Sequence, residues 1–345
     1  MRRFLSGLLL VILFGYAGAL PAPHARAQEP SGAAITLKDF RGKVLSLRQP
    51  ASRIVCLIES ALSGLFMLGA EDRVVGISTN VYQEETFRYY AAMDPRIRER
   101  RLPSPGNWDF ISIEKVVGLK PDLVIIWAHQ EEAILALEER GIPVFGVFIR
   151  TFQDVREEML ALGEMTGKTE QARRLVAETA NTLDRLTNSG ASLPQADRVR
   201  VYYMWAQGEL ETSGGPSTVN ELITLAGGVN VFGSAGQEHL VVNVERILKE
   251  DPQVIVMWYN ARKNPADILQ NPMLQSLSAV RHQRVYEFPE VFSCDLWTLK
   301  YQYAVMLVGK WCYPERFADL DPAREKRDLF RRLYGERQAF LDLIE

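Results

Sequence analysis

The sequence predicts an α/β protein made of two similar lobes, each with a central, mostly parallel sheet, joined by one long helix. Residues 111–127 and 242–258 superpose without a gap, and each reads as a short helix, a proline and an apolar strand. The unit thus occurs twice, at a separation too long for a solenoid repeat. In both copies the apolar run lacks alternation, which is typical of a strand buried on both faces of a parallel sheet. Two such lobes imply a cleft between them.

The expected elements of the first lobe alternate between strand and helix, as a parallel sheet requires. Residues 34–47 alternate apolar and polar side chains around a turn signal at 39–42, which predicts a β-hairpin. Ser60 is a candidate helix N-cap, and the helix that follows should end at Gly69. The remaining expected elements are strands at 53–58 and 74–77, the repeated unit at 111–127, a helix at 131–140 and a strand at 143–148.

The connection between the lobes is predicted to be helical, because residues 152–188 carry no strand signal. Leu175, Thr179, Leu183 and Leu186 recur at helical spacing, so a helix over 169–188 should lie against both lobes. The second lobe then repeats the opening of the first, with a strand at 199–205, a helix at 219–226 and a glycine turn at 227–230. The expected organisation is a signal peptide at 1–27, an N-terminal lobe with a leading hairpin at 28–165, a connecting helix at 166–190 and a C-terminal lobe with C-terminal helices at 191–345.

The first residues resemble a secretory signal peptide. A short basic start at residues 1–3 is followed by an apolar region at 4–20 and a small-residue cleavage site at 25–27. An uncleaved membrane anchor is the alternative, which glycines within the apolar region disfavour. The first cysteine is Cys56, so no lipid-anchored start is expected. The mature chain should begin near Gln28 and reside in the periplasm.

Composition and motifs exclude several classes of function. The formal net charge is −3, with 40 basic and 43 acidic residues, which argues against a nucleic-acid surface. The chain has no G-x-S-x-G, H-E-x-x-H or G-x-G-x-x-G motif. Residues 163–169 resemble a phosphate loop but are one residue short between the glycines, so they are interpreted as a helix break. Among three cysteines, Cys56 should be buried, and Cys294 and Cys312 are either bridged or free.

Several short motifs, taken in order, resemble the periplasmic substrate-binding proteins of ABC importers, in the helical-backbone class that binds iron-siderophores, haem and cobalamin. No single motif is specific, but their order and spacing are. They occur at 39–42 with 53–55, 68–76, 112–124, 221–230, around Glu245, at 277–280 with 284–286, and at 313–317. The resemblance implies a monomeric capture protein that is not an enzyme, has no resident cofactor, binds a small metal chelate and delivers it to an inner-membrane permease dimer.

The resemblance also assigns a role to Glu114 and Glu245, which occupy equivalent places in the two repeats. In this family one acidic residue per lobe docks into arginine-bearing pockets of the two permease subunits. An arginine can bind each carboxylate through two hydrogen bonds, and two such contacts suit a two-fold symmetric partner. The alternative is that both are ordinary acidic residues favoured at helix N-termini.

The ligand is expected between the lobes, at the C-terminal ends of the strands. The candidate ligand-binding residues are Glu59, Ser60, Tyr82, Trp108 and His129 from the first lobe, and Trp205, His239, Tyr259 and Trp297 from the second. Aromatic side chains suit flat chelates, and His129 or His239 could bind an exposed metal, although no metal site is assigned. For each aromatic residue, packing in the core is the alternative.

Glu59 departs from the family pattern, which has a small residue or proline before the serine. A carboxylate facing the cleft would favour a cationic or metal-bearing ligand, whereas a solvated acid or a surface salt bridge would have no such effect. A ferric siderophore is the leading expectation, with cobalamin, haem and an oxyanion such as molybdate as alternatives. An exported chelate-processing enzyme and a ligand sensor are the expectations from other classes. A single connecting helix also predicts small rotations between open and closed forms.

Overall fold

The computed structural model describes residues 34–191, 193–259 and 261–344. The signal peptide predicted at 1–27 lies outside these residues. None of the helices in the described ranges combines the length and the hydropathy needed to cross a membrane.

The first lobe is built on a four-stranded parallel sheet with the order β4-β3-β5-β6. Its strands are β3 (Ile54–Cys56), β4 (Val74–Ile77), β5 (Leu123–Trp127) and β6 (Val144–Val147). They are buried almost throughout, as their unbroken apolar runs predict. The helices of this lobe are α1 (Glu59–Met67), α2 (Glu84–Met93), α3 (Pro95–Arg98), α4 (Ile113–Gly118), α5 (Glu131–Glu138) and α6 (Phe152–Met165), with short 3-10 turns η1 (Glu71–Arg73) and η2 (Thr79–Tyr82).

A hairpin of β1 (Ile35–Lys38) and β2 (Val44–Leu47) precedes this sheet, over the range where the sequence predicts one. Its turn residue Asp39 is buried and accepts a hydrogen bond from the Gly146 amide of β6 at 3.1 Å. Arg41 contacts both Asp39 and Glu138 of α5. The hairpin is therefore anchored to the first lobe at its turn.

The second lobe repeats the first. Its parallel sheet has the order β12-β11-β7-β9, so β9-β7-β11-β12 matches β4-β3-β5-β6 strand for strand. These strands are β7 (Arg200–Met204), β9 (Val229–Asn230), β11 (Val254–Met257) and β12 (Val285–Glu287), and β8 (Glu211–Ser213) pairs separately with β10 (His239–Val241). The helices are α8 (Thr218–Leu225), α9 (Val244–Glu250), α10 (Pro265–Leu269) and α11 (Ser278–Arg281), with a short turn η4 (Pro272–Leu274); η3 (Gln195–Asp197) precedes the lobe.

The two repeated helices, α4 and α9, begin in the same way. The Ser112 side chain accepts a hydrogen bond from the Lys115 amide, and the Asn243 side chain accepts one from the Arg246 amide. Both residues are standard N-caps because their side chains satisfy an amide that the helix leaves without a partner. Glu114 and Glu245 each lie in the first turn.

The two helices also end in the same way, on an arginine that the sequence pattern did not reveal. Arg53, just before β3, donates to the carbonyls of Leu119 and Lys120 at 2.6 and 3.0 Å. Arg200, the first residue of β7, donates to the carbonyls of Glu250 and Asp251 at 3.3 and 2.9 Å. A guanidinium thus binds the last carbonyls of each repeated helix, where the helix dipole favours a cation.

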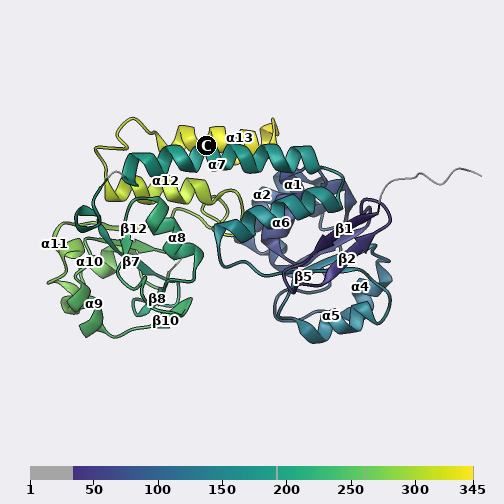
Figure 1. Ribbon diagram of the computed structural model, residues 1–345, viewed down its shortest axis with the longest axis horizontal. Coiled ribbons are helices and arrows are strands. Elements are labelled where there is room, and N and C mark those ends of the chain that lie inside the picture. The colour runs from purple at the N-terminus through teal and green to yellow at the C-terminus, as the bar shows by residue number, and fades with distance from the viewer. Residues whose placement is uncertain (1–33, 192, 260, 345) are drawn as a thin grey trace, which may run out of the picture. The chain divides into compact units, whose positions relative to one another are not determined.

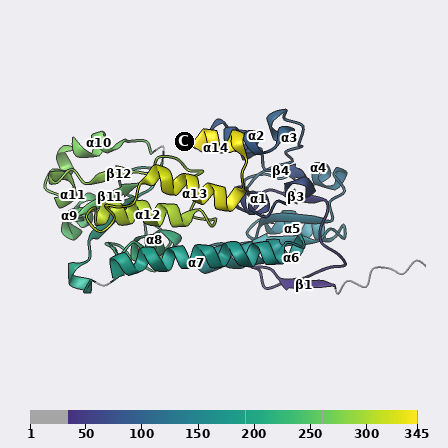
Figure 2. The same ribbon diagram turned by 90° about the horizontal axis from the view of Figure 1, so that it is seen from above.

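Helix α7 (Thr169–Ala191) is the predicted connecting helix (Figure 1). The break before it lies where expected, because Gly167 adopts a left-handed backbone with φ of 65°. Leu175, Thr179, Leu183 and Leu186 are all buried along one face. Thr179 accepts a hydrogen bond at 3.0 Å from Gln302 of α12 (Tyr301–Cys312). Figure 2 shows α7 running beside α6 in the first lobe and below α12 and α8 in the second.

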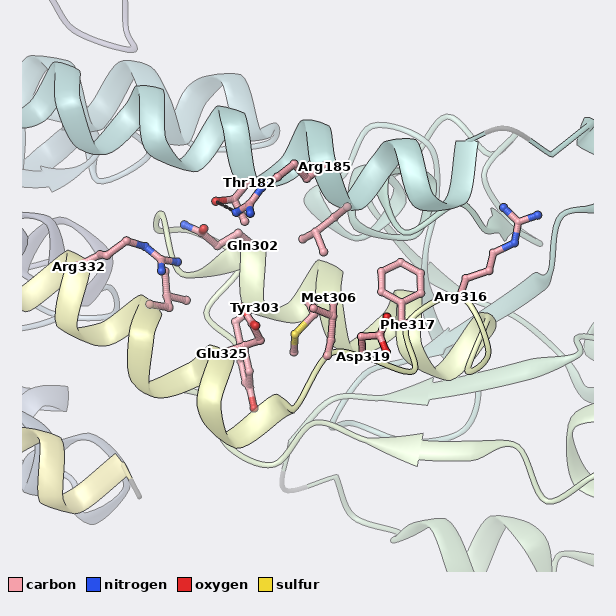
Figure 3. A pocket seen from close by; sticks show the side chains of 13 residues that line it. Thr182, Arg185, Gln302, Tyr303, Met306, Arg316, Phe317, Asp319, Glu325 and Arg332 are labelled. Carbon is pink, nitrogen blue, oxygen red and sulfur yellow. Dashed lines mark hydrogen bonds between the residues drawn. The ribbon is translucent and has the colours of Figure 1, made fainter.

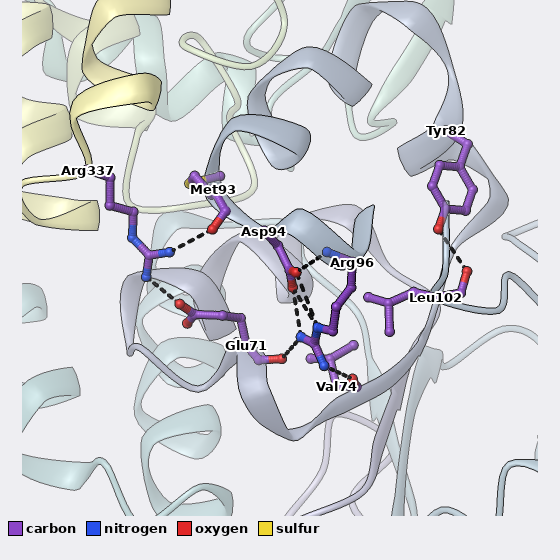
Figure 4. A network of polar contacts seen from close by, with 8 residues as sticks. All are labelled: Glu71, Val74, Tyr82, Met93, Asp94, Arg96, Leu102 and Arg337. Carbon is purple, nitrogen blue, oxygen red and sulfur yellow. Dashed lines mark hydrogen bonds and ion pairs between the residues drawn. The ribbon is translucent and has the colours of Figure 1, made fainter. Parts of the chain in front are cut away.

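The C-terminal helices return to the first lobe. Helix α13 (Pro322–Tyr334) packs against α1, and α14 (Gln338–Ile344) packs against α2. Arg337, between these two helices, donates to the Glu71 carboxylate and to the Met93 carbonyl (Figure 4). The end of the chain therefore adds a second physical link between the lobes.

All three cysteines lie in the described residues, and each is buried and unpaired. Of the two alternatives that the sequence left open for Cys294 and Cys312, the free form is the one observed. Burial raises the pKa of the Cys56 thiol and that of Cys312, the latter to about 12. A thiol held in its protonated form is a poor nucleophile, so the core uses these residues as small apolar side chains.

Candidate ligand-binding site

A cavity of about 690 Å³ lies where the two lobes face one another. It is wide, and most of its lining surface is apolar. The lining residues are Glu59, Ser60, Asn80, Gln83, Glu85, Thr86, Tyr90, Trp108, Trp127, His129, Phe148, Ile149, Glu238, His239, Val291, Phe292, Asp295, Trp297 and Lys300. The volume of this cavity and the composition of its lining are typical of a site that binds a small molecule.

Parallel-sheet topology brings the first-lobe side of the cavity together. Glu59 and Ser60 follow β3, Trp127 ends β5 with His129 two residues later, and Phe148 follows β6. Because neighbouring parallel strands end at the same edge of a sheet, residues far apart in the sequence meet there. The cavity therefore lies at the edge where the sequence places the ligand site.

Glu59 and Ser60 open helix α1, and here one sequence-based expectation is wrong. The helix begins at Glu59, with Ile58 in the cap position and no side-chain cap, so Ser60 is not the N-cap. Its hydroxyl is buried without a hydrogen-bond partner and lines the cavity. Glu59 accepts a hydrogen bond from Ser78 at 2.6 Å, and burial raises the pKa of Glu59 above its ordinary value.

A buried ion pair forms another part of the lining. The Lys300 ammonium lies 3.4 Å from the Asp295 carboxylate and 3.8 Å from the centre of the Phe292 ring, and its side chain is only 1% exposed. Burial lowers the pKa of Lys300, and the nearby Asp295 carboxylate opposes that shift. The single lysine of the lining is thus already engaged by a carboxylate and an aromatic face.

A third carboxyl group, Glu158 of α6, lies in the core behind the cavity. Its Oε1 atom is buried without a hydrogen-bond partner. Burial, and secondarily the Asp295 charge, hold the pKa of Glu158 well above its usual range. Burial thus favours the protonated form of Glu158, which avoids placing an unpaired charge in the core.

Aromatic rings make up the second-lobe wall. Trp297 lines the cavity, and behind it Trp205 and Trp258 lie with ring centres 6.5 and 5.8 Å from the Trp297 ring. The Trp205 indole donates to the Ser213 hydroxyl at 2.9 Å and packs 5.1 Å from the His239 ring. Trp205 therefore supports the wall from the inside.

The backbone of the loop that carries Trp108 is held in place by hydrogen bonds and by close packing. Gln130 donates hydrogen bonds to the carbonyls of Asn107 and Trp108, at 3.0 and 3.1 Å. Gly106 lies so close to the returning chain that a Cβ there would be 2.2 Å from the Phe110 carbonyl oxygen. The backbone is thus fixed while the Trp108 side chain remains 53% exposed at the cavity.

Of the nine predicted ligand-binding residues, six line the cavity: Glu59, Ser60, Trp108, His129, His239 and Trp297. Three do not. Tyr82 donates its hydroxyl to the Leu102 carbonyl at 2.8 Å (Figure 4), and Trp205 is buried behind the wall. Tyr259 lines an adjoining recess, which shares Gln83, Glu85 and Val291 with the cavity. Each of the three follows a strand or loop in the expected order, but local packing turns its side chain elsewhere.

Other lining residues were not predicted from the sequence. Trp127 and Phe148 end apolar runs and were interpreted as core, although a strand's last residue can face the site. Glu238 precedes β10, and burial raises its pKa. Asp295 and Lys300 belong to the segment 294–300, which has no helix or strand pattern to fix the direction of its side chains. Only the tertiary structure brings these residues to the cavity.

The described residues contain no grouping of three or more histidine, cysteine or acidic side chains that could hold a metal ion. His129 and His239 line the same cavity but belong to different lobes. A metal bound here would therefore arrive with most of its ligands supplied by the bound molecule.

A smaller cavity of about 270 Å³ lies between α7, α12 and the segment leading into α13 (Figure 3). Its wall mixes guanidinium and carboxylate groups, including Arg332, Asp319 and Glu325, with apolar side chains such as Met306 and Phe317. It shares no lining residue with the larger cavity. The convergence of strand ends and aromatic residues makes the larger one the candidate ligand site.

Comparison with known proteins agrees with this fold. The chain matches the periplasmic binding protein family over residues 54–291, and it belongs to that family. A cobalamin-binding protein of Halobacterium salinarum is 29% identical over 289 residues, which cover 81% of this chain and 73% of that protein. Family membership makes the chain a periplasmic binding protein.

Solved structures share the fold. MolA of Haemophilus influenzae, in complex with molybdate, superposes with a TM-score of 0.75 at 21% identity, covering 87% of this chain and 97% of MolA. The vitamin B12-binding protein BtuF of Vibrio cholerae superposes with a TM-score of 0.61 at 24% identity, covering 79% of this chain and 99% of BtuF.

Proposed function

We propose that this protein captures a corrinoid such as cobalamin in the periplasm and delivers it to an inner-membrane ABC importer. The observation that carries this proposal is a wide aromatic cavity whose charged lining is mainly acidic. Glu59, Glu85, Glu238 and Asp295 line it against the single cation Lys300, and no arginine belongs to its described lining. Cobalamin has a large, nearly flat corrin ring with many neutral amide side chains, which match such a surface.

The same charges disfavour anionic cargo. An oxyanion such as molybdate requires converging hydrogen-bond donors, and Lys300 is already paired with Asp295. Haem carries two negatively charged propionates. The acidic lining would repel them, and the low local dielectric would strengthen that repulsion. A ferric siderophore, the leading expectation from the sequence, becomes the second candidate, because a ferric hydroxamate without net charge also fits the cavity.

Delivery is supported by the two repeated glutamates. Glu114 and Glu245 are exposed in the first turns of α4 and α9, and within the described residues neither forms a hydrogen bond or an ion pair. Both carboxylates are therefore available to a basic partner. Their equivalent positions suit a permease dimer with one cationic site per subunit.

Ligand specificity is tested by intrinsic tryptophan fluorescence of residues 28–345, titrated with cyanocobalamin, ferrichrome, ferric enterobactin, haem and molybdate. Free tryptophan at equal absorbance corrects for light absorbed by the ligands. We expect saturable quenching by cyanocobalamin, and weak or no binding of ferric enterobactin, haem and molybdate. Tighter binding of any of these three anions than of cyanocobalamin would contradict the proposal.

Matched tryptophan variants locate the bound molecule. Trp297→Phe should weaken cyanocobalamin binding about tenfold, because a central aromatic contact commonly contributes 1 kcal/mol or more. Trp311→Phe is the control, since Trp311 stacks on Tyr286 at 5.1 Å and does not line the cavity. Equal effects of the two substitutions would argue against binding in the cleft.

A further inference from the structure

The two most exposed large apolar side chains among the described residues occupy equivalent positions in the two lobes. Phe110 is 69% exposed and Val241 is 74% exposed. In the internal repeat, Phe110 aligns with Val241 as Glu114 aligns with Glu245, so each apolar residue precedes a proposed docking glutamate by four positions. Single exposed apolar residues are common on protein surfaces and need no explanation. Here, however, two of them lie at equivalent positions in the two lobes, each beside an equivalent glutamate.

Both side chains project from backbone that is well ordered by hydrogen bonds. The Phe110 carbonyl accepts from the Asn107 amide at 2.8 Å, and the Phe110 amide donates to the Asn107 side chain at 3.2 Å. Val241 pairs with Glu211 across the β10–β8 ladder. Exposure therefore results from the fixed direction of each side chain, and a fixed apolar group contributes more to binding than a mobile one.

Neither residue lines the ligand cavity. Phe110 instead lines an adjoining groove of about 760 Å³ with Ile111 and Ile113. Trp108 and His129 line both this groove and the ligand cavity. Asp109, Glu131 and Glu132 also line this groove. A groove lined by both apolar and acidic side chains is complementary to a partner surface that is both apolar and basic.

We infer that Phe110 and Val241 are apolar anchors for the importer, one for each permease subunit. This inference rests on the proposed delivery function and deepens it. Each side chain inserts into an apolar recess next to the cationic site that binds Glu114 or Glu245. The carboxylate provides steering and orientation, while the apolar group provides buried area at the centre of the contact. The partner is therefore a two-fold symmetric membrane protein with a recess and a cation repeated on its two subunits.

Photocrosslinking in intact host cells tests this contact without assuming a ligand. A photoreactive p-benzoylphenylalanine replaces Phe110, Val241, Glu114 or Glu245, one position at a time, in the full chain. We expect adducts with an ABC permease subunit from positions 110 and 241, identified by mass spectrometry. Positions 44 and 343 are the controls, because Val44 and Leu343 are also exposed apolar residues, 62% and 43%, and belong to elements other than α4 and α9.

The outcomes separate the inference from the proposed function. Permease adducts from 114 and 245 but not from 110 and 241 would overturn the anchors and leave delivery standing. Absence of permease adducts from all four positions would overturn delivery itself, and the anchors with it. Adducts equally strong from positions 44 and 343 would show unspecific proximity and would also overturn the inference.

A second measurement distinguishes an anchor from a ligand contact. The variant Phe110→Ser/Val241→Ser should bind cyanocobalamin with a Kd within twofold of wild type, yet importer-dependent uptake of radiolabelled cyanocobalamin should fall about tenfold. The variant Phe110→Leu/Val241→Ile should retain uptake, because it keeps apolar side chains at both positions. A weakened Kd in the serine variant would instead place these residues in the ligand site.

Discussion

Burial controls the protonation of single carboxyl groups near the cleft. Glu59 and Glu238 line the cavity and Glu158 lies in the core behind it, and in each case burial is the main cause of a raised pKa. The Asp295 carboxylate adds to the shift at Glu59 and Glu158. A cationic or metal-bearing ligand that approaches this side of the cavity would favour ionisation of Glu59 and so bind with release of a proton.

Glu158→Gln is expected to stabilise the protein at neutral and alkaline pH. Because the folded-state pKa is raised above the unfolded value, folded Glu158 retains a proton that the unfolded chain has lost at any pH between the two. Stability therefore falls as the pH rises from the unfolded pKa to the folded one, and the amide removes that dependence. We expect Tm to rise by roughly 2 °C at pH 8, since about 1 kcal/mol moves Tm by about 2–4 °C in mid-sized proteins.

Thermal unfolding of both proteins at pH 8 and pH 5 checks this expectation. At pH 5 the difference should shrink, because wild-type Glu158 then holds its proton in the folded state and part of it in the unfolded state. Glu157→Gln is the control, as Glu157 is an exposed neighbour on α6. A Glu158→Gln protein that is less stable than wild type at pH 8 would show that Glu158 is ionised and stabilised by a partner.

Helices α4 and α9 depend on a contact that joins each of them to the neighbouring strand. Arg53→Ala and Arg200→Ala each remove two hydrogen bonds to C-terminal carbonyls. We expect each substitution to lower the free energy of unfolding by about 1 kcal/mol, because both guanidinium groups are exposed. Since the two sites lie in different lobes, the effects should add in the double variant.

Urea unfolding of the two single variants and the double variant measures these effects, and hydrogen exchange locates them. Amides of α4 should lose protection in Arg53→Ala, and amides of α9 in Arg200→Ala. Arg48→Ala is a control for the loss of a charge near β3, as Arg48 is exposed and makes no hydrogen bond or ion pair within the described residues. Unchanged protection in α4 and α9 would show that the arginines do not stabilise the helix ends.

At the scale of helices and strands, the sequence predicts most of the elements but fewer of the contacts between them. Residues 111–127 and 242–258 can be recognised as a repeat from their shared pattern of helix, proline and strand. This pattern predicts a parallel sheet in each lobe. The N-cap at Ser60 was wrong, because an extended Ile58 with an acidic residue at the first helical position can start a helix without a side-chain cap. Arg53 and Arg200 were missed, since their acceptors are carbonyls, which have no sequence signal.

The candidate site shows where such prediction ends. Topology determines which residues follow the strands, and Glu59, Ser60 and His129 were predicted to line the cavity on that basis. Packing determines where each side chain points, and it turns Tyr82, Trp205 and Tyr259 away from the cavity. Asp295 and Lys300 come from an irregular segment, so their proximity at 3.4 Å could be recognised only in the folded molecule.

Within residues 34–344, the two lobes are linked by more than the connecting helix. Helix α7 packs on α6, α8 and α12, and the C-terminal helices bring Arg337 back to Glu71. Movement between the lobes must preserve these contacts or break them. We therefore expect a small rotation on ligand binding, with little change in the radius of gyration measured by solution scattering.

Arg337→Ala provides a comparison for this expectation. Removal of the contacts with Glu71 and Met93 should widen the range of lobe positions in the ligand-free protein, and cyanocobalamin should then produce a larger compaction than in wild type. A large compaction in wild type would contradict the prediction of limited closure.

The three unpaired cysteines have a consequence for how the folded state can be observed. Cys56 lies in β3 of the first lobe, Cys294 in the segment beside the cavity and Cys312 at the end of α12. A thiol reagent can reach each of them only when the surrounding structure opens. The native chain thus contains three internal reporters, and the rate at which each sulfur is modified gives the opening free energy of its own region without any introduced label.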